Sequence, residues 1–313
     1  MEYKITDFDI IYLSYDEPRY KEHYADVLLK WPWVKHVHGV KGFDSAHKAC
    51  ADISETERFI TIDGDNIVDP KFFDIVIDIP DEHHDRVYSW AARNSINTLV
   101  YGNGGLKCWP VEFVKNMKTH ENAEEDSSTV DFCWDNKYVQ FEDIFCETYP
   151  NGSPLQAFRA GFREGVKMTL DRGERVSLKD IDDNKLWGGN LKRLEIWCSI
   201  GADVDNGLWC MYGARLGAYM TNLTDWDHDE IADYDWFNIF WEEQIKHKFE
   251  TEDSTHHCLY TNYSWSYDKL WEENVNLGRR LKRSMGLNVA DFDESQSKFF
   301  KHVYVAPSRK GYV

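Results

Sequence analysis

Apolar and polar residues follow each other in blocks along the first part of the chain, and each block has the period of one kind of element. Residues 8–15 are almost continuously apolar, which is typical of a strand buried in a parallel sheet. Residues 19–31 repeat apolar positions at helical spacing. The same order returns as a short strand at 34–40, a helix at 45–53 and a strand at 58–62. Strands that alternate with helices at this spacing predict a doubly wound, mostly parallel α/β sheet.

The second part of the chain is patterned mainly for helices. Residues 86–94 still favour a strand, and a glycine cluster follows at 101–110. Residues 153–168 predict a helix, because Ser153 suits the cap and Pro154 the first turn. Further helical patterns cover 190–202, 225–249 and 277–287, and no internal repeat is visible. We therefore expect an α/β core at 1–185, with a largely helical extension at 186–313 packed on it.

Aromatic residues are abundant for a chain of 313 residues, which is long enough to bury a full core. They make up 15% of the sequence and include 13 tryptophans and 17 tyrosines. Indole and phenol rings offer a flat face with one polar edge, so such a surplus often lines sites for sugars or bases. Packing within the core is the alternative explanation for most of these rings.

Charge argues against loose binding to nucleic acid or anionic membranes, because the formal net charge is -19. The balance reverses after Leu277, where basic residues outnumber acidic ones. This segment fits either a docking site for a polyanion or a solvated helix face. Its basic residues are Arg279, Arg280, Lys282, Arg283, Lys298, Lys301, Arg309 and Lys310.

Cysteine usage and hydropathy predict a compartment. The seven cysteines are odd in number, widely spaced and without a CxxC pair, which fits reduced thiols. The first residues lack the apolar core of a signal peptide, and no stretch approaches the ~20 apolar residues that span a bilayer. We expect a soluble cytoplasmic protein without a membrane partner, in the host cytoplasm if a phage encodes it. The sequence does not indicate an oligomeric state.

The stretch ERFITIDGDNIVDP places two carboxylates where an apolar strand ends. Asp63 and Asp65 are two residues apart, so in extended chain both side chains lie on one side and repel each other. A shared Mg²⁺ or Mn²⁺ ion relieves that repulsion, because both cations prefer oxygen ligands. A calcium loop of the EF-hand type does not fit, since Val68 occupies the glycine position. An acidic turn without a metal is the remaining alternative.

With these motifs in place, residues 8–170 resemble the glycosyltransferases of the GT-A fold. DIIYLSYDEP matches the first strand of that family, and FITIDGDN matches its D-x-D motif. The resemblance implies a metal held by Asp63 and Asp65 that bridges the diphosphate of a nucleotide sugar, with a UDP-sugar favoured. Such a metal stabilises charge on the departing nucleoside diphosphate.

The resemblance also assigns roles to residues that would contact the donor. Ser14, Tyr15 and Asp16 match the end of the first strand, where the family holds the nucleoside. Lys48 would contact a phosphate, with an ordinary surface lysine as the alternative. Gly104 and Gly105 would let the backbone approach a ligand closely, and Trp109 would stack on a sugar or base, with a simple tight turn as the alternative for this segment.

Inverting members of the family use a carboxylate as general base, and some members add a histidine as a third metal ligand. Glu142 and Asp143 lie about ten residues before the helix that starts near Ser153, so they are the candidate base, with Asp135 in reserve. A solvated acidic turn is the alternative there. His228, within DWDHDE, is the candidate third ligand.

The acceptor is inferred from a looser similarity. The segments IDGDN, GNGGLKCWP and FRAGFREG resemble phage glycosyltransferases that modify hydroxymethylated pyrimidines. This implies the 5-hydroxymethyl group of hydroxymethylcytosine or a related base in duplex DNA as acceptor. Arg159, Arg163 and Lys167, together with the basic run near 280, would contact its phosphates. A glycan, protein or small-molecule acceptor is the rival, and a carbohydrate-binding protein with a structural calcium ion is the non-enzymatic alternative.

Overall fold

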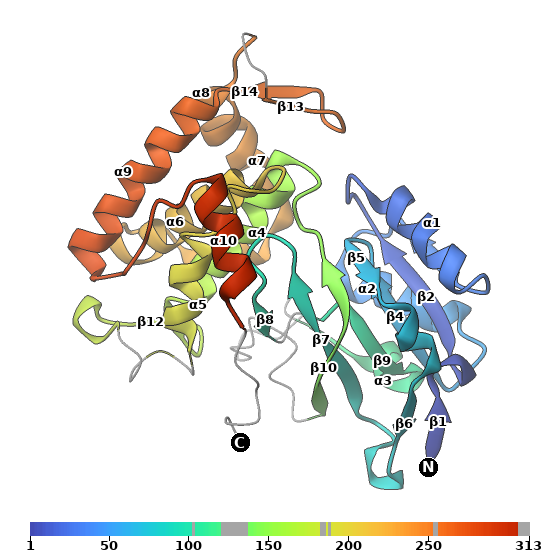
Figure 1. Cartoon of the computed structure of the whole chain (residues 1–313). Coiled ribbons are helices and arrows are strands. Elements are labelled where there is room, and N and C mark those ends of the chain that lie inside the picture. Colours follow the sequence, from blue (N-terminus) through green and yellow to red (C-terminus); the bar gives the residue numbers. More distant parts are fainter. Residues whose placement is uncertain (102–103, 120–136, 182–185, 187–188, 253–255, 306–313) are drawn as a thin grey trace.

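The computed structural model describes residues 1–101, 104–119, 137–181, 186, 189–252 and 256–305 (Figure 1). An α/β half built around one large sheet is followed by a half made mainly of helices (Figure 1). The strands of the large sheet are β2 (Asp9–Ser14), β3 (Lys35–His38), β4 (Arg58–Asp63), β5 (Asn66–Val68), β7 (Val87–Asn94), β8 (Val100–Tyr101), β9 (Leu106–Pro110) and β10 (Tyr138–Thr148). This arrangement confirms the predicted fold class, an α/β fold with a mostly parallel sheet and a largely helical C-terminal region.

The sheet has the order β3-β2-β4-β9-β7-β10-β5, and β8 pairs with β7 beside this path. Strands β3, β2 and β4 are parallel, as are β7 and β10. Strand β9 is antiparallel to both β4 and β7, which places β4, β7 and β10 in the same direction. Because parallel strands end at one edge of a sheet, the carboxyl ends of β2, β4 and β10 meet there, and this edge is the expected ligand side.

Helices cover both faces of the sheet, as the doubly wound prediction requires. Alternate residues of β2 face opposite sides. Ile10 and Tyr12 pack with α1 (Tyr20–Lys30), whereas Ile11 packs with α2 (Phe43–Ile53) and α3 (Val111–Asn116).

The helical half has its own core, centred on α4 (Pro154–Lys167) and α6 (Gly207–Leu223). Ser153 caps α4 as predicted, since its hydroxyl accepts from the Gln156 amide at 3.1 Å. The predicted domain boundary near 185 stays a prediction, and α4, which precedes it, packs within the helical core. The other helices here are α5 (Asn190–Trp197), α7 (Tyr234–Phe240), α8 (His247–Phe249), α9 (Tyr267–Met285) and α10 (Glu294–Val303).

Three short two-stranded ribbons complete the strands of the described residues. In each ribbon the two strands are antiparallel. The ribbons pair β1 (Glu2–Lys4) with β6 (Val76–Asp78), β11 (Leu170–Asp171) with β12 (Glu174–Arg175), and β13 (His256–Cys258) with β14 (Tyr263–Trp265).

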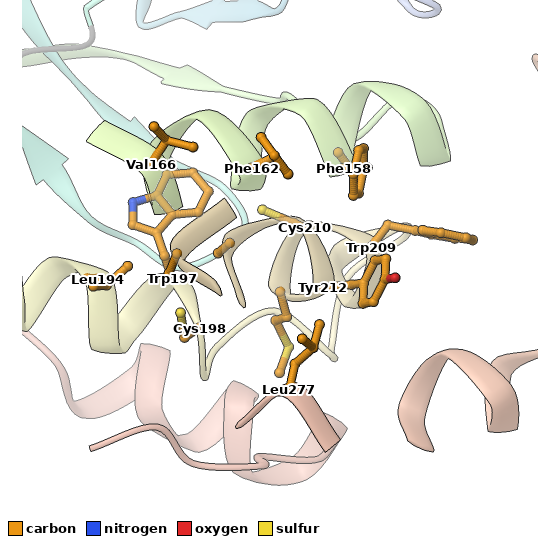
Figure 2. Close-up of a cluster of buried hydrophobic side chains, with 14 of the residues drawn as sticks. Phe158, Phe162, Val166, Leu194, Trp197, Cys198, Trp209, Cys210, Tyr212 and Leu277 are labelled. Carbon is orange, nitrogen blue, oxygen red and sulfur yellow. The ribbon is translucent and has the colours of Figure 1, made fainter. Parts of the chain in front are cut away.

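Glycines spaced four residues apart let α4 and α6 pack backbone against backbone. A Cβ at Gly165 would lie 2.2 Å from the carbonyl oxygen of Ala214, and one at Gly213 would lie 2.2 Å from that of Phe158. Gly161 and Gly217 are equally close to the facing helix. Figure 2 shows the aromatic residues of α4 pointing into the core that surrounds this contact. No side chain fits at these positions unless the helices separate.

A fully buried arginine joins α6 to the segment after α9. The Arg215 guanidinium donates to the carbonyl of Cys198 at 2.7 Å and to that of Ala290 at 2.9 Å. It also pairs with Asp291 at 2.7 Å. The buried charge is thereby paired with a carboxylate and hydrogen-bonded to backbone carbonyls, as burial of a guanidinium requires.

Within the described ranges, no helix is both long and apolar enough to cross a membrane. Each cysteine that the structure describes is a buried free thiol, in agreement with the reduced state expected from the sequence.

Candidate functional site

The acidic pair, Asp63 and Asp65, lies at the carboxyl edge of the sheet as predicted. Asp63 ends β4, and its amide donates to the carbonyl of Gly105 at 3.0 Å. The carbonyl of Asp65 accepts from the amide of Tyr149 at 2.7 Å, just after β10 ends. The turn between β4 and β5 is therefore fixed by backbone hydrogen bonds on both sides.

Side chains beneath the turn hold its central residue, Gly64. The Tyr12 hydroxyl donates to the Gly64 carbonyl at 2.7 Å, and Nδ1 of His23 lies 3.1 Å from the same oxygen. A Cβ at Gly64 would lie 2.7 Å from a carboxylate oxygen of Glu17. The absence of a side chain at Gly64 thus lets Glu17 lie directly against the acidic turn.

Glu17 is a third carboxylate at this edge, beside the predicted residues Ser14, Tyr15 and Asp16 but not among them. It lies in the turn after β2, where its oxygen accepts from the Tyr15 amide at 2.7 Å. Burial raises its pKa, and the charges of Asp16 and Asp63 add to that rise. Its position directly after the first strand, within SYDEP, is the sequence signal that could have identified it.

The electrostatics of the site are those of crowded carboxylates. Burial raises the pKa of Asp65 to about 7, and the charges of Asp63 and Glu17 contribute to the rise. Burial likewise raises the pKa of Asp63, although Lys107 opposes this. Near neutral pH the site therefore has an unmet requirement for positive charge.

Two neighbours orient the acidic pair. Asn66, almost completely buried, donates from Nδ2 to Oδ1 of Asp65 at 2.8 Å. Lys107 lies with Nζ 3.8 Å from Oδ2 of Asp63 and donates to the carbonyl of Gly104 at 2.6 Å. Both residues fix the carboxylates from the side of the sheet and leave the outward oxygens available.

This donor set fits a hard divalent cation that keeps other ligands. Mg²⁺ and Mn²⁺ favour oxygen, and Mg²⁺ is commonly held by one or two carboxylates together with substrate phosphates and water. The described residues contain no group of three or more His, Cys, Asp or Glu side chains arranged to hold a metal. A cation bound by the acidic pair would thus complete its coordination with water or substrate oxygens.

The residues predicted to hold the nucleoside lie at the end of β2, next to this turn. Ser14 is buried, and its hydroxyl lies 2.9 Å from Nε2 of His36 and from Nδ1 of His38 on the neighbouring strand. Tyr15 is 45% exposed, which leaves its ring free to contact a ligand. Asp16 is exposed beside it. Ser14 therefore fixes the strand ends, and Tyr15 and Asp16 face solvent.

Residues from the helical half approach the same edge. Arg159 of α4 lies 3.9 Å from Asp16, and its guanidinium carbon is 4.7 Å from the ring centre of Tyr234. Lys41, after β3, pairs with Asp235 of α7 at 2.7 Å. These contacts bring cationic side chains of both halves to the rim of the carboxylate site.

The glycine-bearing segment lies beside the acidic pair, but its details differ from the prediction. A Cβ at Gly104 would overlap the carbonyl oxygen of Trp90 at 1.5 Å, and one at Gly105 would meet the Asn66 amide at 2.1 Å. These glycines allow close approach to protein groups. Lys48 lies half-buried in the middle of α2.

The prediction that Trp109 stacks on a ligand is wrong. Its side chain is fully buried, and Nε1 donates to the Thr61 hydroxyl at 2.9 Å. The ring packs edge-on against His47 beneath α2. Since Trp109 lies on β9 inside the sheet, it is a core residue.

The predicted base and third ligand are not assembled with the acidic pair. Glu142 and Asp143 lie in a bulge of β10, where the register with β7 shifts, and not in a turn. Asp143 is five residues before Thr148, which at ~3.3 Å per residue is roughly 16 Å from the edge. Nε2 of His228 lies 2.9 Å from the carbonyl of Gly173. Asp135 lies outside the described residues.

Comparison with known proteins gives two distant structural matches. HddC from Yersinia pseudotuberculosis has 17% sequence identity and a TM-score of 0.26, over 44% of this chain and 69% of HddC. A glycosyltransferase involved in the glycosylation of the major capsid of PBCV-1 has 13% identity and a TM-score of 0.28, over 45% of this chain and 93% of its own. No family model and no curated protein sequence matches this chain.

Proposed function

We propose that this protein is a glycosyltransferase that moves a sugar from a nucleoside-diphosphate sugar to an acceptor hydroxyl, with Mg²⁺ or Mn²⁺ at the acidic pair. The observation that carries the proposal is the gathering of Glu17, Asp63 and Asp65 around one rigid turn at the carboxyl edge of the sheet. Ligands of open α/β sheets bind at this edge.

Each part of the site has a task in that reaction. A bound cation would neutralise negative charge on the diphosphate leaving group. Asp63 and Asp65 would hold it, and Asn66 keeps the Asp65 carboxylate in place through its 2.8 Å hydrogen bond. Tyr15 and Asp16 would contact the nucleoside from the end of β2. Arg159, at the rim, is positioned to meet an anionic group of the donor.

The general base stays a prediction. Glu142 and Asp143 lie on the β10 bulge, so they can accept a proton only from an acceptor that extends along this strand. His228 as a third metal ligand and Asp135 as reserve base are likewise predictions without support from a contact.

For the acceptor we propose a 5-hydroxymethylpyrimidine in duplex DNA. The supporting observation is that Arg279, Arg280, Lys282 and Arg283 are all exposed on α9, in a protein whose net charge is -19. Exchange of all four for Gln is expected to weaken DNA binding and to make its dependence on salt shallower. An unchanged salt dependence would contradict a DNA contact at this helix.

The proposed activity is tested by incubating the protein with a panel of nucleotide sugars and Mn²⁺. A transferase releases nucleoside diphosphate slowly even without acceptor, whereas a carbohydrate-binding protein releases none. Asp65→Asn is expected to abolish the release and keep the fold, because the amide cannot supply a negative charge to the cation. Asp74→Asn, at an exposed position, is the matched control and should retain the wild-type rate.

Acceptor panels then separate the finer alternatives. Mass spectrometry of DNA digests after the reaction detects a sugar on hydroxymethylcytosine or hydroxymethyluracil. Transfer to a glycan, a protein or a small molecule, with unmodified DNA, would contradict the DNA acceptor and leave the glycosyltransferase proposal standing.

A further inference from the structure

A basic cavity lies on the helical half, lined by residues of α6, α8 and α9 and by none of the residues around the acidic pair. Its volume is about 680 Å³. In Figure 1, α9 lies on the side of the helical half that faces away from the sheet. The cavity is lined by Tyr212, Leu216, Tyr219, Lys248, Glu273, Asn276, Leu277, Arg279, Arg280 and Arg283. It is therefore separate from the carboxylate site.

Positive charge dominates this lining. Glu273 is its one carboxylate, and Lys248 already pairs with it at 2.6 Å. Three guanidinium groups remain, from Arg279, Arg280 and Arg283. A guanidinium presents a planar fork of donors that matches the oxygens of a phosphate.

The protein holds these arginines without neutralising them. Arg280 lies over the ring of Tyr219, with its guanidinium carbon 5.6 Å from the ring centre. Arg279 donates to Oδ1 of Asn276 at 3.3 Å, which is a neutral partner. For Arg283, no hydrogen bond or ion pair occurs with any residue that the structure describes.

The acidic residues that follow α9 in the sequence are occupied elsewhere. Asp291 pairs with the buried Arg215 at 2.7 Å. Asp293 caps α10, where it accepts from the Gln296 amide at 2.8 Å. These two carboxylates therefore do not balance the charge of the α9 arginines.

The size of the cavity, like its positive charge, is suited to binding a ligand. The volume lies within the usual range of small-molecule sites, roughly 300–1,000 Å³. Leu216 and Leu277 contribute apolar surface, and the tyrosines contribute hydroxyl groups. Apolar side chains beside convergent cations suit an organic phosphate better than a bare inorganic anion.

We infer that this cavity is a second ligand site, distinct from the donor site, that binds phosphate groups. Two sources share this chemistry: a nucleotide-sized organic phosphate, and the backbone of a nucleic acid strand. The inference does not depend on glycosyl transfer, because it concerns equilibrium binding at α6, α8 and α9.

The test is calorimetric titration of the full-length protein in EDTA, so that no divalent cation can recruit phosphate to the acidic pair. The probes are inorganic pyrophosphate, ATP and a short DNA duplex. Wild-type protein is expected to bind at least one of them. The double variant Arg280→Gln, Arg283→Gln is expected to bind it at least about tenfold more weakly, since charge-assisted hydrogen bonds are lost.

The matched control is Lys71→Gln with Lys269→Gln, which removes the same charge from exposed positions outside the cavity. Control affinity near that of wild type, with a loss in the arginine variant, supports the site. Binding of ATP alone assigns the source to an organic phosphate, and binding of the duplex alone assigns it to a strand. Failure of the wild type to bind any probe, or an equal loss in both variants, would overturn the inference.

Discussion

Replacement of Asp65 by Asn tests how much the crowded carboxylates destabilise the metal-free protein. Burial and the charges of Asp63 and Glu17 raise the pKa of Asp65 to about 7, compared with about 4 in an unfolded chain. A carboxyl whose pKa is higher in the folded than in the unfolded state costs no stability at a pH below its unfolded-state pKa. As the pH rises above that value the free energy of unfolding falls, and the loss is complete once the pH exceeds the folded-state pKa. The loss therefore develops between about pH 4 and pH 7.

The magnitude follows from the shift. About three pKa units at 1.36 kcal/mol each give an upper figure of about 4 kcal/mol for ionising Asp65 in the folded state. The side chain is partly exposed, so solvent screening reduces this, and we take about half. Asn keeps the oxygen that accepts from Asn66 and removes the charge. The melting temperature of the variant at about pH 8 is then expected to exceed that of wild type by roughly 3 °C.

The assay is thermal unfolding in EDTA at about pH 5 and about pH 8, followed by addition of Mn²⁺. The gain of Asp65→Asn should appear at the higher pH and shrink at the lower one. Mn²⁺ should stabilise wild type and leave the variant unchanged, since binding to the folded state alone raises stability. Asp74→Asn serves as control. A variant with the wild-type pH dependence would refute the reasoning.

Three further substitutions test other parts of the structure. Gly213→Ala places a methyl group 2.2 Å from the carbonyl of Phe158, so thermal unfolding should show a loss of about 1–3 kcal/mol, and unchanged stability would contradict the close helix contact. Trp109→Phe removes the hydrogen bond to Thr61 and should lower stability by about 1–3 kcal/mol, with KM for the donor unchanged; a raised KM would restore a ligand role. Lys107→Gln removes the positive charge 3.8 Å from the acidic pair, so Mn²⁺ should bind more tightly above pH 7, and weaker binding would be the contrary result.

Local sequence signals predicted much of the fold. The helix expected at 153–168 is α4, because a serine cap and a first-turn proline act within one turn of chain. The alternation of strand and helix up to residue 63 likewise gave β2, α1, β3, α2 and β4 in order. These elements are determined by residues close to one another in the sequence, so the pattern of apolar residues is enough to predict them.

Elements that depend on distant contacts were harder to predict. Strand β9 was interpreted as a glycine segment, since its partners β4 and β7 come from elsewhere in the chain. Strand β10 carries the polar bulge at Glu142 and Asp143, which resembles a turn in sequence. Helix α6 was not predicted as a separate helix. Its glycines are explained only by the close packing of α4 against them.

The site shows the same division. Asp63 and Asp65 were found because a strand end is readable in sequence. Lys107 and Asn66 were not, because they reach the pair through sheet pairing and a turn. Trp109 was predicted to stack on a ligand, although it is buried. The sequence alone does not show whether a tryptophan beside glycines faces solvent or the core.

The central claim is that Asp63 and Asp65 bind a divalent cation that a sugar nucleotide completes. Electron paramagnetic resonance of Mn²⁺ measures this directly, by titrating free Mn²⁺ against protein with and without a nucleoside diphosphate. The account predicts binding that tightens when the nucleotide is added and that Asp63→Asn with Asp65→Asn abolishes. Equal Mn²⁺ binding by wild type and this double variant, with nucleotide present, would contradict it.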